Sequence, residues 1–293
     1  MYHQLSPSIL GPLQSLGVPI VMTIHDYNLI SPDKDVYYEE VGKQYWKFLF
    51  VHKYSFFKRA LLVKKMYWEK MMGLYKKSID LYIVPSMFVQ NVFLQAGFPE
   101  EKVVILPHFI SGEKKPVSEG NSTEKPFALY FGSVSEEKGV DDLIEIFDTL
   151  EIPLVIAGEA SDFRPSSSAY VTLVGQKSKE DLAVLIERSF CVVSASRLPE
   201  TFGLIALEAS AFGKPFFGFA TGALGEVIEN GKNGYLASDK ASLQKYLTDF
   251  FQGKLHFDAS QIQDDAYARF GEVSYRQKLE TLFEQQQEKK RRK

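Results

Sequence analysis

The chain has 293 residues, of which 45% are hydrophobic and 24% charged; its formal net charge is -3 and it has one cysteine. This length suits one large domain or two of ordinary size, and no apolar stretch of about 18 residues is long enough to span a membrane. The balance of charge argues against a general nucleic-acid binder, and the lone Cys191 excludes an internal disulfide and suits the cytoplasm, where we expect the protein.

The first 110 residues alternate between helical and strand patterns. In chain order the pattern predicts a helix at 6–17, strands at 18–26 and 80–86, a helix at 87–98 and a strand at 101–109. His25 stands near the end of the first strand, where a histidine is either structural or directed at a ligand. Three parallel strands would leave an open sheet edge, so we expect residues 1–110 to be part of a Rossmann-like domain whose first strands are missing.

Residues 43–77 contain ten Lys or Arg, ten aromatic residues and one acid, Glu69. Basic residues mixed with aromatic ones suit an anionic membrane surface or a lipid-linked acceptor. This interpretation would make the protein peripheral on the inner membrane face. The alternative is a pair of helices that bury their aromatic side chains while the lysines face water.

The rest of the chain predicts a second domain. Residues 111–126 are rich in Pro, Gly, Ser and charge, as an interdomain linker is. The pattern then predicts strands at 127–132, 153–158, 170–175, 190–196 and 214–220, and helices at 139–150, at 179–189, from about 203 and from about 243. Short apolar strands that alternate with helices indicate a doubly wound α/β domain, here 127–270, before a C-terminal helix and basic tail at 271–293.

Two carboxylates follow the strand at 190–196, in the stretch "LPETFGLIALEAS". Glu200 lies where ligands bind in open α/β sheets, and Phe202 and Gly203 lead into a helix whose first N–H groups suit an anion. Glu208 lies about a turn and a half into that helix, within reach of hydroxyl groups. A nucleotide sugar carries both a diphosphate and vicinal hydroxyls. The alternative is that Glu200 only caps the helix and Glu208 is a surface residue.

Two other glycine-containing stretches follow strands. In "YFGSVSEEKG" Gly132 ends a strand, and Lys138 could place a cation on a phosphate, although a lysine in such a context is usually just solvated. Residues 221–237 predict a third Gly-rich turn, which either faces a ligand or is an ordinary loop.

These stretches resemble family 4 glycosyltransferases, which are retaining enzymes with the GT-B fold of two Rossmann-like domains. Glu200 and Glu208 match the family's E-x7-E pattern within residues 199–237. Residues 130–147 resemble its G-R-x4-K-G segment, 20–32 the strand that carries its histidine, and 80–109 the end of its first domain. The resemblance covers nearly the whole chain and implies an α/β GT-B protein whose first domain is incomplete.

The resemblance implies a transfer of sugar from a nucleotide-sugar donor to a glycan or lipid-linked acceptor, with retention and without a metal or other cofactor. His25, Glu200 and Lys138 correspond to the family's catalytic residues. Glu200 is expected at the sugar hydroxyls, Glu208 at the ribose and Lys138 at the diphosphate. The full set expected to bind the donor is Gly132, Ser133, Lys138, Glu200, Phe202, Gly203, Leu204, Ile205 and Glu208.

Two departures from the family pattern leave alternatives open. Ser133 stands where the family has an arginine, and loss of one such donor to developing charge can cost roughly 10²–10³ in rate. The family's first Gly-rich loop is also absent. The chain could therefore be a non-catalytic nucleotide-sugar-binding remnant or a subunit that requires a partner chain. A GT-B-fold epimerase is a third alternative, which the E-x7-E context disfavours.

Overall fold

The computed structural model describes residues 7–31, 55–57, 59–64, 73–114, 116, 127–159 and 168–292. The chain divides into two compact units, one of Met1–Pro107 with Val273–Lys293 and one of His108–Glu272. Each unit contains a parallel sheet with helices, which confirms the predicted α/β class. Most of the predicted 111–126 linker and most of the basic-aromatic stretch 43–77 lie outside the described residues.

The first unit has a three-stranded parallel sheet in the order β1-β2-β3. Its strands are β1 (Val21–Thr23), β2 (Leu81–Val84) and β3 (Val103–Ile105), and the helices α1 (Leu10–Ser15), α4 (Leu74–Ser78) and α5 (Met87–Gln95) lie among its described residues. All four residues of the middle strand β2 are buried, as its continuous apolar sequence requires. Helix α5 begins after Ser86, whose hydroxyl accepts a hydrogen bond from the Val89 amide at 3.1 Å.

The C-terminal helix α12 (Glu272–Arg291) belongs mainly to this first unit, although it follows the second unit in sequence. Three of its side chains, Tyr275, Leu279 and Leu282, pack against Leu81, Ile83 and Leu106 of the three-stranded sheet and the residue after it. Near its end, Lys290 Nζ lies 3.4 Å from Asp80 Oδ2. Packing against the sheet therefore keeps this polar, lysine-rich segment helical to Arg291.

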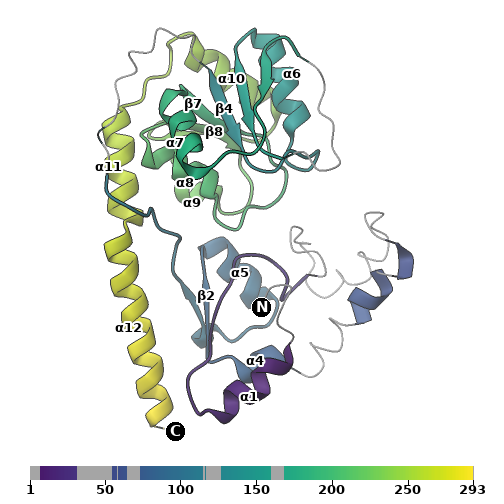
Figure 1. Ribbon diagram of the computed structural model, residues 1–293, viewed down its shortest axis with the longest axis vertical. Coiled ribbons are helices and arrows are strands. Elements are labelled where there is room, and N and C mark those ends of the chain that lie inside the picture. The colour runs from purple at the N-terminus through teal and green to yellow at the C-terminus, as the bar shows by residue number, and fades with distance from the viewer. Residues whose placement is uncertain are drawn as a thin grey trace. The chain divides into compact units, whose positions relative to one another are not determined.

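The second unit has a six-stranded parallel sheet in the order β6-β5-β4-β7-β8-β9 (Figure 1). Its strands are β4 (Ala128–Phe131), β5 (Leu154–Ala157), β6 (Val171–Leu173), β7 (Cys191–Ser194), β8 (Phe216–Phe219) and β9 (Gly234–Ala237). Counted from β4, this is the 3-2-1-4-5-6 order of a dinucleotide-binding domain. The order reverses between β4 and β7, so the ligand site is expected at the carboxyl ends of these two strands.

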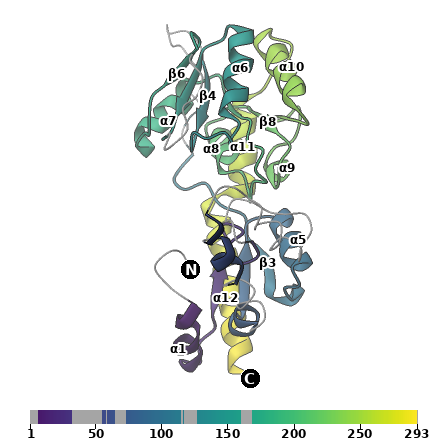
Figure 2. The same ribbon diagram turned by 90° about the vertical axis from the view of Figure 1, so that its right-hand side faces the viewer.

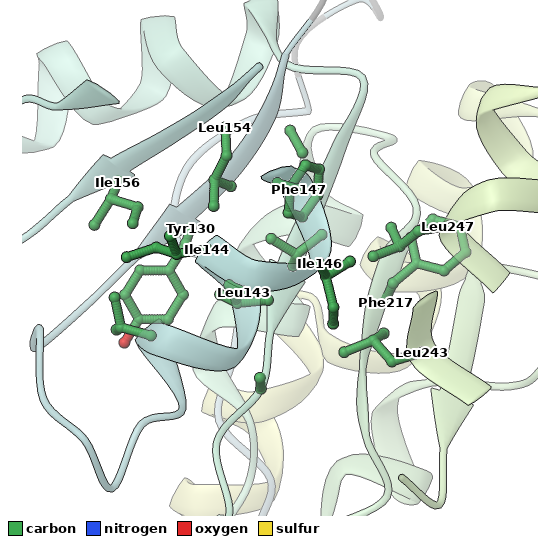
Figure 3. Close-up of a cluster of buried hydrophobic side chains, with 14 of the residues drawn as sticks. Tyr130, Leu143, Ile144, Ile146, Phe147, Leu154, Ile156, Phe217, Leu243 and Leu247 are labelled. Carbon is green, nitrogen blue, oxygen red and sulfur yellow. The ribbon is translucent and has the colours of Figure 1, made fainter. Parts of the chain in front are cut away.

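Helices cover both faces of this sheet (Figures 1 and 2). One face carries α6 (Val140–Leu150) and α10 (Lys240–Phe251), and the other carries α7 (Lys179–Arg188), α8 (Leu204–Ala211) and α11 (Ala259–Phe270). Figure 3 shows the first face, where Leu143 and Phe147 of α6 and Leu247 of α10 are fully buried against the strands. The apolar residues of α6 recur at helical spacing and therefore form one face of the helix, and this face packs into the core.

The stretch predicted as a Gly-rich turn, 221–237, contains two short elements instead. These are α9 (Leu224–Val227) and the strand β9, which pairs with β8 from Phe216 opposite Gly234 onward. Four residues are too few to show a period in the sequence, so only pairing with β8 reveals the strand. No helix within the described residues combines the length and the apolar character that crossing a bilayer requires.

Candidate functional site

The loops after β4 and β7 meet at the carboxyl edge of the sheet. These strands are neighbours, with Ala128 opposite Cys191, and the Arg197 amide donates to the Glu137 carbonyl at 3.3 Å between the two loops. Gly139 permits this approach. Its φ is +67°, and a Cβ there would lie 2.0 Å from the carbonyl oxygen of Ala195. Only glycine fits a left-handed turn in such contact with backbone.

The contact between the loops brings Lys138 and Glu200 together. Lys138 Nζ lies 2.7 Å from Glu200 Oε1, and the side chains are 28% and 23% exposed. The Ser135 hydroxyl accepts the Lys138 amide at 3.3 Å and shapes the turn that presents the lysine. An ammonium group has three N–H donors, so Lys138 can bind Glu200 and still donate two hydrogen bonds to a ligand.

Tyr130, in β4, supports the first loop, a role that the sequence does not predict. Its phenol donates a 2.7 Å hydrogen bond to the carbonyl of Ser133. Burial, and next the negative charge of Glu200, hold the pKa of Tyr130 well above its usual range, so the phenol remains a neutral donor. Gly132 and Ser133 are exposed, and the Gly132 amide donates to the Ala157 carbonyl at 3.0 Å. The strand pattern of "ALYF" gives no sign of this role for the tyrosine.

The start of α8 provides N–H groups beside the same edge. Gly203 is its N-cap, and the Ala206 amide is the first in the helix to bond to the Gly203 carbonyl, at 3.0 Å. Leu204 and Ile205 are the first two residues of α8, and helix geometry leaves the N–H groups at these positions without an intrahelical partner. Leu204 is exposed and Ile205 half-buried. The helix start can therefore accept an anion.

Phe202 belongs to the core instead of the ligand-facing surface. Its ring is 2% exposed and packs edge-on against His108 and Phe270, with centroid distances of 5.2 and 5.6 Å. A donor could therefore meet only the backbone of Phe202. Phe202 is predicted as a donor-binding residue because it directly precedes Gly203 at the start of α8, and this position in the sequence does not reveal the direction of the ring.

Glu208 lies one turn further along α8 and lines a pocket of about 400 Å³ between α7, α8, α11 and residues 109–116. The pocket also contains the side chains of Lys179 and Lys214. Glu208 is exposed as a residue, yet loss of water around its carboxyl group raises the pKa of that group, and the charge of Lys179 partly offsets the rise. Hydroxyl donors from a ligand would stabilise the carboxylate form.

His25 lies in the first unit, two residues after β1 and at the carboxyl end of its sheet, where it is exposed. The structure thus brings Lys138, Glu200 and the Ser133 loop together, while His25 belongs to the other unit. Within the described ranges, no three His, Cys, Asp or Glu side chains gather as a metal ion would require.

Comparison with known proteins identifies the family. The model of the family described as "Glycosyl transferases group 1" matches residues 111–269, which is more than half of the chain. An uncharacterized glycosyltransferase of Methanocaldococcus jannaschii is 29% identical over 165 residues, covering 54% of this chain and 45% of that protein. A glycogen synthase of Mycobacterium tuberculosis is 35% identical over 119 residues, covering 36% and 28%. This chain spans about half the length of its curated relatives, or less.

Solved structures share the fold. Anabaena HepE, crystallised with UDP and glucose, superposes with a TM-score of 0.68 and 21% identity over 94% of this chain and 76% of that one. Sucrose-phosphate synthase from Thermosynechococcus elongatus gives a TM-score of 0.66 and 20% identity over 90% and 67%. These likenesses confirm the predicted GT-B architecture with Rossmann-like units.

Proposed function

The chain belongs to the glycosyl transferases group 1 family, and on this premise we propose that it moves a sugar from a nucleotide-sugar donor to a glycan or lipid-linked acceptor with retention of anomeric configuration. The observation that supports this proposal best is the 2.7 Å pair of Lys138 and Glu200 at the reversal point of the sheet. Lys138, which can still donate two hydrogen bonds, and the carboxylate of Glu200 thus lie beside the start of α8, which can accept an anion.

In this proposal the diphosphate of the donor lies at the start of α8, against the amides of Leu204 and Ile205. Lys138 donates to a phosphate oxygen while it retains Glu200. As the bond between the sugar and the phosphate breaks, negative charge grows on the leaving diphosphate, and these preorganised donors stabilise it. The site would need no metal ion, because the ammonium and the helix start supply the positive potential.

In this proposal Glu200 contacts the donor sugar. Its carboxylate accepts hydrogen bonds from the sugar hydroxyls and, by its charge, stabilises the positive character that develops on the sugar ring. The acceptor hydroxyl attacks from the face that the diphosphate leaves and passes its proton to the departing diphosphate oxygen, and this same-face attack preserves the configuration. Glu208 accepts hydrogen bonds from the ribose hydroxyls, and His25, from the first unit, is proposed at the donor sugar. These assignments follow the family pattern residue by residue.

Relatives support the substrate class. HepE binds UDP, glucose and UDP-glucose in its crystal structures, and a Salmonella typhimurium relative, 24% identical over 63% of this chain and 55% of that protein, is a lipopolysaccharide N-acetylglucosaminetransferase. We therefore place UDP-sugars first among donors and cell-surface glycans or glycolipids first among acceptors. Contact of residues 43–77 with an anionic membrane is part of the proposal, and liposome binding with and without acidic lipid tests it.

A second candidate function, nucleotide-sugar binding without transfer, is favoured by Ser133. The residue that occupies the family's arginine position is a neutral, exposed serine whose carbonyl is held by Tyr130. Without a guanidinium the leaving diphosphate has one cation fewer. Binding that is intact while turnover is absent would favour this candidate.

Titration of the purified protein with UDP-, GDP- and ADP-sugars, followed by a transfer assay, tests the proposal. We expect saturable binding of one donor class, release of the nucleoside diphosphate with an acceptor present, and an NMR spectrum that shows the donor's anomeric configuration in the product. Inversion in the product would contradict the retaining mechanism, and lack of binding to every donor would contradict both candidate functions.

A further inference from the structure

The backbone of Glu200 is held by the turn that precedes α9. The Ala223 amide donates a 2.8 Å hydrogen bond to the carbonyl of Glu200. Gly222 lies directly against the same residue, because a Cβ on Gly222 would approach the Glu200 amide nitrogen to 2.4 Å and its carbonyl oxygen to 2.2 Å. The position of this turn therefore sets the position of the Glu200 backbone.

The first residue of α9 continues this contact to the start of α8. Leu224 is 1% exposed, and a Cβ on Gly203 would lie 2.5 Å from its Cδ2 atom. The turn and α9 together thus cover the loop from Glu200 to Gly203 along its length. Any shift of α9 would move both the carboxylate and the helix start that the proposed function assigns to the donor.

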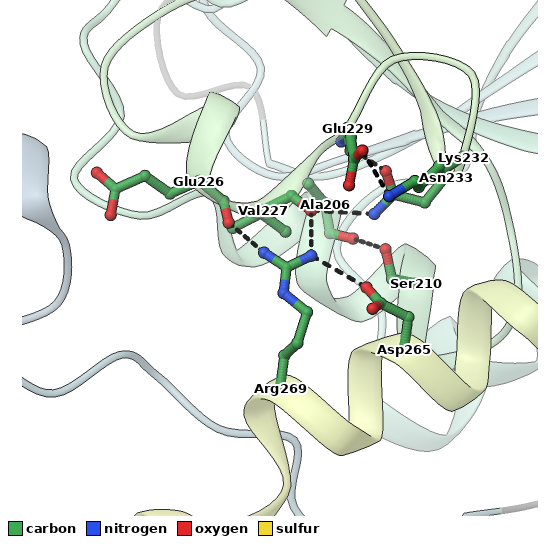
Figure 4. A network of polar contacts seen from close by, with 9 residues as sticks. All are labelled: Ala206, Ser210, Glu226, Val227, Glu229, Lys232, Asn233, Asp265 and Arg269. Atoms are coloured by element: carbon green, nitrogen blue, oxygen red, sulfur yellow. Dashed lines mark hydrogen bonds and ion pairs between the residues drawn. The ribbon is translucent and has the colours of Figure 1, made fainter.

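The other end of α9 is fixed by Arg269 of α11 (Figure 4). Its guanidinium donates to the carbonyls of Glu226 and Val227, at 3.4 Å for Val227, which are the last two residues of α9. Asn233 donates a second hydrogen bond, of 3.0 Å, to the Val227 carbonyl. Carbonyls at a helix end have no intrahelical partner, and a cation there is also favoured by the helix dipole.

A helix of four residues has little stability of its own, since one turn fixes many dihedral angles for few hydrogen bonds. Its position must come from what holds its ends. Asp265, one turn before Arg269 on α11, accepts a 3.0 Å hydrogen bond from the guanidinium and orients it. The next residue, Phe270, packs against Phe202 inside the loop itself. The end of α11 thus contacts the loop directly and, through α9, indirectly.

We propose that Arg269 is a positioning residue: by holding the end of α9, it fixes the Gly222–Leu224 turn against the Glu200–Gly203 loop and so keeps Glu200 and the start of α8 in the geometry that donor chemistry requires. This inference rests on the proposed function for its effect on turnover. Its structural half, the dependence of the Ala223–Glu200 hydrogen bond on Arg269, is independent of any activity.

Amide hydrogen exchange of the unliganded protein tests the structural half. In Arg269→Met, which keeps most of the side-chain length but removes the donors, the Ala223 amide should exchange about tenfold faster than in the parent. The Leu243 amide, which donates to the Asp239 carbonyl at the start of α10, should not change. In Arg269→Lys, which keeps the positive charge but lacks the planar fork of the guanidinium, the exchange rate of the Ala223 amide should lie between those of the parent and of Arg269→Met. Unchanged exchange at Ala223 in a folded Arg269→Met protein would overturn the proposal.

Two further variants separate positioning from loss of charge. Arg292→Met removes an exposed arginine with an i,i+4 partner, Glu288, just as Arg269 has Asp265. It should leave Ala223 exchange and turnover unchanged. Asp265→Asn removes the ion pair but keeps the carbonyl contacts of Arg269, and it should have a smaller effect than Arg269→Met. An equal effect in Arg292→Met would overturn the proposal.

Donor kinetics test the functional half. Arg269→Met should lower kcat by about tenfold with a smaller change in the KM for the donor, because the misplaced groups, Glu200 and the start of α8, act on the charges that develop as the bond between the sugar and the diphosphate breaks. A purely structural role would lower the melting temperature and leave kcat of the folded protein unchanged, which would overturn the functional half. If the parent protein transfers no sugar, the proposed function fails, and the exchange result still decides the role of Arg269.

Discussion

Lys138 Nζ lies 2.7 Å from Glu200 Oε1, although the two residues are 62 positions apart in the sequence. The pair joins the loops that follow the two central strands of the second unit, β4 and β7. Because both side chains are about a quarter exposed, each keeps surface for a ligand. The pair thus organises the site before a donor arrives.

Replacement of Lys138 by Met should weaken donor binding. Loss of one charge-assisted hydrogen bond to a phosphate costs roughly 1.5–3 kcal/mol, about a tenfold to hundredfold rise in Kd. Isothermal titration with the donor that the parent binds best measures the change. Lys245→Met, at an exposed lysine of α10, is the matched control and should bind as the parent does. Equal affinity in both variants would remove Lys138 from the site.

The Lys138–Glu200 interaction should also appear in the free energy of unfolding. In a double-mutant cycle with Lys138→Met and Glu200→Gln, we expect a coupling of about 1 kcal/mol, since the pair is only partly shielded from water. Urea denaturation of the parent, both single variants and the double variant measures it. Additive effects of the two substitutions would show that the pair makes no net contribution to stability.

Replacement of Gly139 by Ala should separate the two loops. The new Cβ would lie 2.0 Å from the Ala195 carbonyl, so the free energy of unfolding should fall by about 3 kcal/mol or more, and donor binding should be lost with it. Gly175→Ala is the control, because Gly175 has a similar φ of +70° but no neighbouring atom within 4 Å. Gly175→Ala should lower the free energy of unfolding only by the cost of a left-handed backbone for a residue with a Cβ, about 1–2 kcal/mol. Similar losses in the two variants would contradict the role of the contact.

Glu208 should make stability depend on pH. Its folded-state pKa is raised from the ordinary 4.5, so the folded protein holds a proton that the unfolded chain releases. The contribution of this bound proton to the free energy of unfolding is fully present below pH 4.5 and is lost as pH rises through the folded-state pKa. Glu208→Gln should therefore gain stability relative to the parent over that rise. Denaturation midpoints from pH 4 to 8 measure the difference, and a difference independent of pH would contradict the burial of this carboxyl group.

Glu208→Ala should weaken donor binding by roughly 1.5–3 kcal/mol, as for hydrogen bonds to a charged group. Glu187→Ala is the control, because Glu187 lines the same pocket from α7 and has no assigned contact with the donor. Titration with the same donor compares the two. A larger loss in the control than in Glu208→Ala would move the donor to a different part of the pocket.

Introduction of an arginine at position 133 should raise turnover. If the missing guanidinium limits the stabilisation of the leaving diphosphate, Ser133→Arg should increase kcat by about tenfold or more. Ser133→Met adds bulk without charge and should not. The steady-state rate of nucleoside diphosphate release measures both. A rate in Ser133→Arg that is no higher than in Ser133→Met would indicate that the site works without this cation.

From the sequence alone, strands β4 to β8 and helices α6, α7, α8 and α10 of the second unit could be predicted, whereas α9, β9 and α11 could not. Each of the predicted strands is a short apolar run, and helices such as α6 and α7 have an apolar stripe; both patterns are properties of neighbouring residues. Gly203 and Ser86 likewise mark the starts of α8 and α5 by their local chemistry. The placement of Glu200 after a strand also followed from the sequence, because parallel strands direct ligands to their carboxyl ends.

Which of these loops meet depends on the three-dimensional fold. The pairing of β4 with β7, and the backbone contact that Gly139 permits, bring Lys138 to Glu200. Three other contacts also depend on the fold: the packing of the Phe202 ring into the core, the hydrogen bond of the Tyr130 phenol to the Ser133 carbonyl, and the hydrogen bonds of Arg269 to the end of α9. These relations join residues far apart in the chain, and their energies depend on packing and burial, which no local pattern of residues contains.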